Sequence, residues 1–224
     1  MTHQQARQAD SPGQRRLRCA ACLRPQSACI CAWVTPVAHQ IEVLILQHPL
    51  EADHPKGSAR LLHLCLPHSR LLTGEVFGDA AVLTAPLEQA AATGQARHNI
   101  LLYPDTPHDR ALGIAAPPAL PPGALQSPSR LRLIVLDGTW RKSRKMLYLN
   151  PVLQSLPRLS LQGLPPSSYR IRKAHQTDQL STLEATCAAL MQLEGDADKF
   201  HPLLTAFDGF VAQQLDHLPS RPSQ

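Results

Sequence analysis

Apolar and polar positions alternate along the chain in blocks that predict strands followed by helices. Short apolar runs at 41–47, 99–104 and 131–136 each end in a proline or a polar turn, which is typical of buried strands. The run at 131–136 is interrupted only by Arg132, so it is expected inside a sheet with both faces covered. Three or more strands separated by helices and long connections favour an α/β fold with a largely parallel sheet and flanking helices.

The helices are predicted from capping residues and from three- and four-residue spacing. Ser58 is expected to cap one helix, and a second leaves the turn at 137–140. Ser181 and Glu184 form a capping-box pattern before an apolar run. A last helix follows Gly195. Its apolar stripe is expected in the core or in a dimer contact, and it comprises Phe200, Leu203, Leu204, Phe207, Phe210, Val211 and Leu215.

Four of the six cysteines follow the pattern C-x2-C-x6-C-x-C near the N-terminus. In a reducing compartment, thiols this close together predict a tetrahedral zinc site, with free thiols or an oxidised pair as the alternatives. Four thiolates fill the coordination shell, so the zinc is expected to be structural. The predicted ligands are Cys19, Cys22, Cys29 and Cys31, whereas Cys65 and Cys187 are expected in the core.

The length of 224 residues suits one domain with an appendage or two small domains, and a hydrophobic fraction of 43% is enough for a core. We expect a disordered tail at 1–17, a zinc-binding module at 18–36, a main domain at 37–216 and a tail at 217–224. No apolar run approaches the roughly 20 residues of a membrane span, and the polar N-terminus lacks the apolar segment of a secretory signal. A cytoplasmic protein without a membrane partner is therefore expected.

Positive charge is concentrated in the middle of the chain. The net charge is +5, but the span from Arg130 to Lys173 holds ten basic residues and a single acid, Asp137. The residues after Lys173 include seven acids and two bases. The uneven distribution indicates either two solvated faces or a nucleic-acid surface in the middle of the chain.

The sequence Asp137-Gly138-Thr139-Trp140, placed after a buried strand and before a basic helix, resembles the DTW-domain family. The four-cysteine cluster is also found in bacterial members, and the resemblance covers nearly all of residues 19–216. Further segments are similar to the motifs of the family in the same order, and they are Gln47-His48-Pro49, 55–61, 102–104, 169–173 and 180–185.

The resemblance implies a tRNA-uridine aminocarboxypropyltransferase. Such enzymes move the 3-amino-3-carboxypropyl group of S-adenosylmethionine to N3 of a uridine, giving acp3U, in bacteria at position 47 of the tRNA, and release methylthioadenosine. The resemblance also implies a relation to SPOUT-type RNA modification enzymes, whose sheet region is knotted. The expected partners are tRNA and S-adenosylmethionine, and a monomer is slightly favoured.

Under this resemblance, the catalytic turn contains Asp137, Thr139 and Trp140. Asp137 is expected to contact the uridine imide, either as the general base that removes the N3 proton or as a group that orients the uracil. Neighbouring cations would weaken it as a base and burial would strengthen it. A turn or helix cap is its structural alternative. Trp140 is expected either to stack on a base or to fill the core.

The donor is expected at the strand ends, because parallel sheets bind ligands at their carboxyl edge. Ser181 and Thr182, at a helix N-terminus, either bind the carboxylate of the donor or only cap the helix. The predicted donor-binding residues are Leu46, Gln47, His48, Pro49, Leu102, Tyr103, Pro104, Asp137, Gly138, Ser181 and Thr182. The cations expected to contact RNA phosphates, next to the zinc module, are Lys56, Arg60, Arg141, Lys142, Arg144, Lys145, Arg170, Arg172 and Lys173.

Two other functions fit parts of this pattern. An S-adenosylmethionine-dependent RNA methyltransferase would use the same donor and RNA but transfer the methyl group. A non-catalytic, zinc-containing RNA-binding protein would explain the cysteines and the cations. It would give no reason for the isolated acid, Asp137, at the turn.

Overall fold

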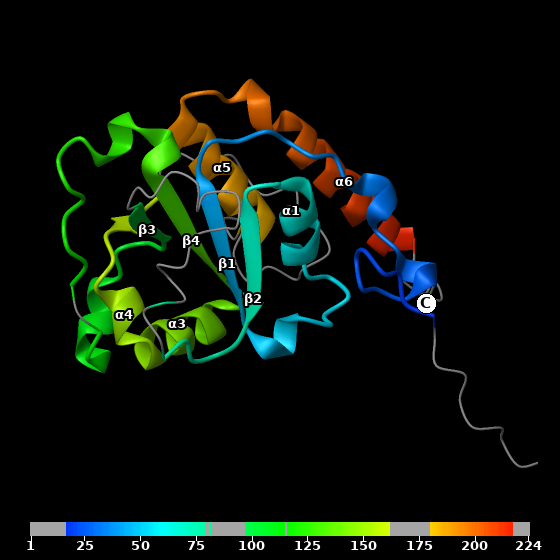
Figure 1. The fold of residues 1–224 in the computed structure, drawn as a ribbon. Coiled ribbons are helices and arrows are strands. Elements are labelled where there is room, and N and C mark those ends of the chain that lie inside the picture. Colours follow the sequence, from blue (N-terminus) through cyan, green and yellow to red (C-terminus); the bar gives the residue numbers. More distant parts are fainter. Residues whose placement is uncertain (1–16, 79–80, 82–96, 115, 162–179, 217–224) are drawn as a thin grey trace, which may run out of the picture.

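The computed structural model describes residues 17–78, 81, 97–114, 116–161 and 180–216. They contain a five-stranded sheet in the order β2-β1-β4-β3-β5 (Figure 1). All four pairs of neighbouring strands are parallel, which confirms the α/β prediction. The strands are β1 (Glu42–Gln47), β2 (Ser69–Thr73), β3 (His98–Leu102), β4 (Leu131–Asp137) and β5 (Arg158–Leu159).

Helices cover both faces of the sheet. One core cluster joins β1 and β4 to α1, α5 and α6, and the other joins the opposite faces of these strands to α3 and α4 (Figure 1). The helices are α1 (Ala59–Cys65), α3 (Trp140–Leu149), α4 (Pro151–Gln154), α5 (Thr182–Glu194) and α6 (His201–Asp216). Short 3-10 turns are η1 (Gln26–Ala28), η2 (Cys31–Trp33), η3 (Pro49–Glu51), η5 (Pro107–Leu112), η6 (Ala124–Gln126), η7 (Pro128–Arg130) and η8 (Asp198–Phe200).

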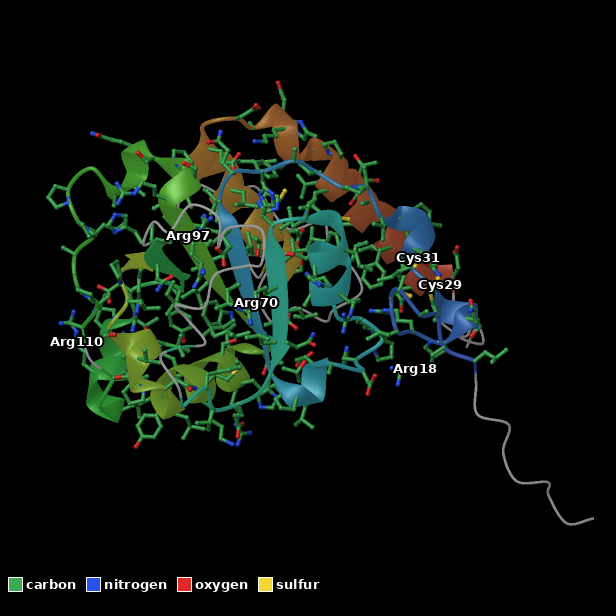
Figure 2. The ribbon with its side chains drawn as sticks, in the orientation of Figure 1. Arg18, Cys29, Cys31, Arg70, Arg97 and Arg110 are labelled. Atoms are coloured by element: carbon green, nitrogen blue, oxygen red, sulfur yellow. The ribbon has the colours of Figure 1, made fainter. Side chains whose placement is uncertain are left out.

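The central strands β1 and β4 are buried along their whole length, including the one residue expected to interrupt the pattern. Arg132 is buried, and its Nε lies 2.7 Å from Oε1 of Glu42, its register partner on β1. Arg97 contacts the other oxygen of Glu42 at 3.0 Å, at the amino edge of the sheet (Figure 2). Because buried charges must be paired, Arg132 is accommodated inside the sheet as part of this ion cluster.

The last helix places its apolar stripe in the core, as one of the two alternatives predicted. Phe200, Phe207 and Phe210 are fully buried, whereas Leu215 is 42% exposed. Among the described helices, none is long and apolar enough to cross a membrane. The domain limits and the knot stay predictions, and the predicted tails lie almost wholly outside the described residues.

Candidate active site

The strand ends that were expected to bind the donor meet at one edge of the sheet. In the register of the sheet, Gln47 at the end of β1 pairs with Asp137 at the end of β4. On the other side of β4, Leu102 pairs with Val135, so Tyr103 and Pro104 follow at the same edge. This edge is where α3 begins (Figure 1). It is the carboxyl edge, where open α/β sheets place their ligands.

Asp137 is held at this edge by two side chains from distant parts of the chain. The Thr182 hydroxyl donates to Oδ1 at 2.7 Å, and the Gln47 amide donates to Oδ2 at 2.9 Å. The backbone N–H of His48 donates to the Asp137 carbonyl oxygen at 2.9 Å. Only 5% of Asp137 is exposed. The carboxylate is therefore fixed in one orientation, which is the arrangement needed to present an acceptor to a ligand.

The α3 helix is capped by Thr139, and not by Asp137. The Thr139 hydroxyl accepts from the backbone N–H of Lys142 at 3.4 Å, so the helix-cap alternative for Asp137 does not hold. Gly138 allows this first turn to pack closely, because a Cβ atom at Gly138 would lie 3.1 Å from Cβ of Lys142. Thr139 therefore caps α3, while the Asp137 carboxylate accepts hydrogen bonds from Thr182 and Gln47.

Trp140 lies on the surface, so the core-packing alternative is wrong. The side chain is 51% exposed and meets the buried Tyr103 ring edge-on, with centroids 5.8 Å apart and planes at 74°. This contact fixes one side of the indole and leaves the remainder accessible. An exposed, partly fixed aromatic ring beside a strand edge suits stacking on a base.

The hydroxyls at the start of α5 are engaged within the protein. Ser181 forms the predicted capping box, accepting from the Glu184 N–H at 3.1 Å, while Glu184 accepts from the Ser181 N–H at 2.7 Å. The Thr182 hydroxyl donates to the Asp137 carboxylate. Ser58 occupies the N-cap of α1 without capping it, and its hydroxyl instead accepts from the Leu183 N–H at 3.4 Å. The ligand role predicted for Ser181 and Thr182 therefore stays a prediction.

The other predicted donor residues differ in exposure. Leu46, Gln47 and His48 are buried, whereas Pro49 is exposed and begins η3. The His48 ring accepts from the Leu50 N–H and contacts Glu75 at 2.9 Å. The side chains of Leu46, Gln47 and His48 therefore pack inside the protein, which agrees with a donor site built from backbone groups.

Two acids from elsewhere in the sequence neutralise cations of α3. Lys142 pairs with the buried Glu51 at 2.8 Å, and Lys145 pairs with Glu75 at 2.9 Å. Hydrogen bonds from Lys145 and then from His48 hold the pKa of Glu75 below its usual range. Asp137 is the only acid in the cationic span of the sequence, but the fold brings acids of the 51–75 region to the same helix.

The outer face of α3 keeps its arginines and two aromatic rings exposed. Trp140, Arg144 and Tyr148 are spaced by four residues and therefore share one face, with Arg141 beside them. Tyr148 is 55% exposed and was not among the predicted site residues, although its spacing from Trp140 was visible in the sequence. The other predicted RNA contacts are divided between partly buried residues, Lys56 and Arg60, and residues that lie outside the described part, Arg170, Arg172 and Lys173.

Comparison with known proteins identifies the family. The sequence profile of the DTW domain matches residues 16–215. The chain belongs to the DTW domain family. The matched range includes the Asp137–Trp140 turn, and the search of solved structures found no match to this DTW chain.

Several curated proteins resemble this DTW chain. A Macaca fascicularis protein named tRNA-uridine aminocarboxypropyltransferase 2 is 27% identical over 211 residues, covering 92% of the chain and 66% of the relative. The mouse protein of the same name is 29% identical over 209 residues, covering 91% and 65%. An Arabidopsis thaliana tRNA-uridine aminocarboxypropyltransferase A is 29% identical over 237 residues, covering 93% and 85%. The chain thus spans just under two thirds of the mammalian relatives.

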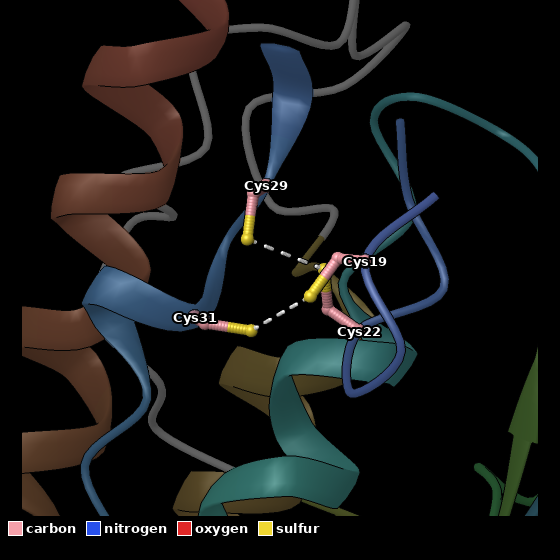
Figure 3. A group of neighbouring side chains, drawn as sticks. All are labelled: Cys19, Cys22, Cys29 and Cys31. Atoms are coloured by element: carbon pink, nitrogen blue, oxygen red, sulfur yellow. Dashed lines mark hydrogen bonds between the residues drawn. The ribbon is translucent and has the colours of Figure 1, made fainter. Parts of the chain in front are cut away.

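The cysteine cluster of this DTW chain has the geometry of a zinc site (Figure 3). The sulfur atoms of Cys19, Cys22, Cys29 and Cys31 all lie within 4.8 Å of one another. Cys19 and Cys31 are 3.6 Å apart, and Cys22 and Cys29 are 3.7 Å apart. Zinc–sulfur bonds of about 2.3 Å give a tetrahedron with edges of about 3.8 Å. All six cysteines are free thiols, so the oxidised-pair alternative does not apply.

The thiols of the cluster differ in acidity. Backbone N–H groups of Cys22 and Ala21 lower the pKa of Cys19 to about 6, whereas burial and neighbouring thiols raise the pKa of Cys31 to about 12. One thiolate therefore forms readily. A second and a third at these separations require a cation, and a divalent metal supplies it. The donor set fits Zn²⁺.

The segment that carries the four cysteines contacts both α6 and the loop before α1. Trp33 packs against α6, where a Cβ atom on Gly209 would lie 2.2 Å from its ring, and its Nε1 donates to Gln213 at 2.6 Å. Arg24 donates to the carbonyl oxygens of Pro55 and Gly57 at 2.6 and 2.8 Å. Figure 2 shows Cys29 and Cys31 on this side of the molecule. This cysteine segment therefore braces the loop that leads from η3 to α1.

Proposed function

We propose that this chain transfers the 3-amino-3-carboxypropyl group of S-adenosylmethionine to N3 of a tRNA uridine, giving acp3U, with position 47 as the target. The observation that carries the proposal is the similarity, over 91–93% of the chain, to proteins named tRNA-uridine aminocarboxypropyltransferase. The placement of Asp137 and Trp140 together at the carboxyl edge of the sheet supports it.

The reaction joins uridine N3 to the carbon of the aminocarboxypropyl group that is attached to sulfur. As the N–C bond forms, the C–S bond breaks and its electron pair stays on sulfur, which leaves neutral methylthioadenosine. N3 is a poor nucleophile until its proton leaves. Asp137 accepts that proton and passes it to solvent, while Gln47 and Thr182 hold the carboxylate in place.

The RNA is bound along the outer face of α3. Trp140 stacks on a base beside Asp137, and Tyr148 offers a second ring two turns further along the helix. Arg141 and Arg144 contact phosphates, which position the RNA without reading its sequence. Lys142 and Lys145 contribute less, because Glu51 and Glu75 already neutralise them.

The zinc ion is structural in this proposal. Cys19, Cys22, Cys29 and Cys31 would complete its coordination shell, so no position is left for a substrate. A bound metal would fix the segment from which Arg24 donates to the loop before α1, and that loop carries Lys56. S-adenosylmethionine is the second substrate, and its sulfonium supplies the electrophilic carbon.

Product analysis tests the proposal. The purified protein is incubated with unmodified tRNA and S-adenosylmethionine, and mass spectrometry measures both the nucleosides and the adenosine by-product. Formation of acp3U with an equal amount of methylthioadenosine is expected. Methylated uridine with S-adenosylhomocysteine would show the methyltransferase instead. Binding of tRNA without either product would favour the non-catalytic RNA-binding protein. Nucleoside analysis of tRNA from cells that lack the protein identifies the modified position.

A further inference from the structure

Arg158 lies close to the carboxyl edge of the sheet, and none of the acids in the described part of the chain pairs with it. It lies on β5, where its register partner on β3 is Leu101. Its Nη1 donates to the Pro104 carbonyl oxygen at 3.3 Å, and its guanidinium lies over the Tyr103 ring at 5.3 Å from the centroid. Tyr103 in turn contacts Trp140. The guanidinium is therefore held beside the proposed active site.

Two further nitrogens of this guanidinium, Nε and Nη2, are shielded from solvent. Among the described residues, none accepts a hydrogen bond from Nε or Nη2 of Arg158, and both atoms are shielded from solvent. Burying a charged donor without an acceptor costs free energy, and proteins keep such groups where a ligand satisfies them. Nε and Nη2 are the two parallel donors on one side of the guanidinium. Their geometry matches a single carboxylate bound through both oxygens.

We propose that Arg158 binds the carboxylate of the aminocarboxypropyl group of the donor. This assignment rests on the proposed function, because it takes S-adenosylmethionine as the donor. It replaces the hydroxyls of Ser181 and Thr182, which are engaged by Glu184 and Asp137. An RNA phosphate fits less well, because the exposed Arg141 and Arg144 are reachable from an RNA backbone and the shielded nitrogens of Arg158 are not.

Shielding also strengthens the pair. A carboxylate and a guanidinium attract each other more strongly where water is excluded, so a guanidinium with shielded nitrogens discriminates well between ligands with and without the negative charge. The donor reaches Nε and Nη2 only when the groups that cover them move. The pair then fixes the amino-acid end of the donor while leaving its sulfonium carbon to face the uridine.

Two ligands and two variants test the assignment. Calorimetry measures the affinity of the wild type, Arg158→Gln and Arg158→Lys for S-adenosylmethionine and for its decarboxylated analogue, which lacks only the carboxylate. Arg158→Gln should weaken the binding of S-adenosylmethionine by about 10- to 100-fold and leave the affinity for the analogue unchanged. Arg158→Lys should recover part of the loss, because a lysine keeps the charge without the paired donors. Arg130→Gln, an exposed arginine at the amino end of β4, is the matched control and should change neither affinity.

The outcomes separate this assignment from the proposed function. If the wild type binds S-adenosylmethionine and Arg158→Gln binds it equally well, the assignment is wrong while the proposed function stands. An unchanged donor affinity with a weaker tRNA affinity would place a phosphate on Arg158 and would also overturn it. A wild type that binds no S-adenosylmethionine would refute the proposed function. Melting adds a second readout, because replacing a guanidinium with two shielded donors that lack an acceptor should change the stability of the ligand-free protein little.

Discussion

The replacement of Asp137 with asparagine separates the two roles that its carboxylate can have. Asparagine has nearly the same shape, so Thr182 can still donate to Oδ1, and the Gln47 amide can turn over to accept from the new Nδ2. The fold and the orientation of the side chain are retained. The variant loses the negative charge and the ability to accept a proton. It therefore tests whether residue 137 removes the N3 proton of the uridine, and not whether it orients the uracil.

The expected loss follows from general base catalysis. A positioned base contributes about 10²- to 10⁴-fold, which corresponds to about 2.7–5.5 kcal/mol of the barrier at 1.36 kcal/mol per factor of ten. The two hydrogen bonds to Asp137 lose their charge assistance, at about 1 kcal/mol each, and the removal of a buried charge offsets part of this loss. The melting temperature should therefore change by only about a few degrees.

The assay is a single-turnover measurement of acp3U formation at saturating S-adenosylmethionine and tRNA, with both affinities measured separately. Asp137→Ala is the companion variant, since it removes both the base and the orienting acceptor and leaves Gln47 and Thr182 without their partner. If Asp137→Asn reacts within about tenfold of the wild type while Asp137→Ala does not, the base role is refuted and only orientation remains. If both variants react at nearly the wild-type rate, Asp137 has no part in the mechanism.

Three further results are expected. Cys29→Ser should release the zinc and speed hydrogen exchange in the loop before α1, and retention of one zinc per chain in a metal assay would contradict the four-thiolate site. Arg141→Gln should reduce the salt slope of tRNA binding by about one. Lys142→Gln, which removes a residue already paired with Glu51, should reduce the slope less, and two equal slopes would place the RNA elsewhere. The pKa of His39 is lowered, mainly by burial, so its contribution to stability is complete above about pH 6.5 and is lost as the pH falls toward its folded-state pKa. Denaturant unfolding between pH 7 and 5 should therefore show a flatter pH dependence of stability in His39→Gln than in the wild type. Identical slopes would show that His39 does not cause the loss of stability.

The central strands and the metal cluster could be predicted because their signals are local. The apolar runs of β1 and β4 are contiguous, the capping box needs only Ser181 and Glu184, and four cysteines lie in one short segment. The edge strand β2 was missed, because Arg70 and Thr73 break its apolar pattern and the strand, paired only with β1 in the described sheet, is partly exposed. Local patterns describe burial well at the centre of a sheet and poorly at its edge.

The partners within the site depend on tertiary structure. Gln47, Asp137 and Thr182 were each predicted to belong to the site, but their mutual hydrogen bonds require the register of β1 on β4 and the position of α5. Likewise, nothing near Lys142 or Lys145 in the sequence indicates their pairing with acids 91 and 70 positions away. Such pairs are set by the packing of whole elements, which residue spacing does not encode.

The contact of Trp33 with α6 determines when the N-terminal module can complete its structure. The hydrogen bond from Trp33 to Gln213 joins residues 180 positions apart, and the one from Gln213 to the Cys29 carbonyl joins residues 184 apart. During synthesis the chain emerges from the N-terminus, so the first folded segment waits for one of the last. The cysteines can gather around a metal early, but their docking surface exists only after α6 has left the ribosome.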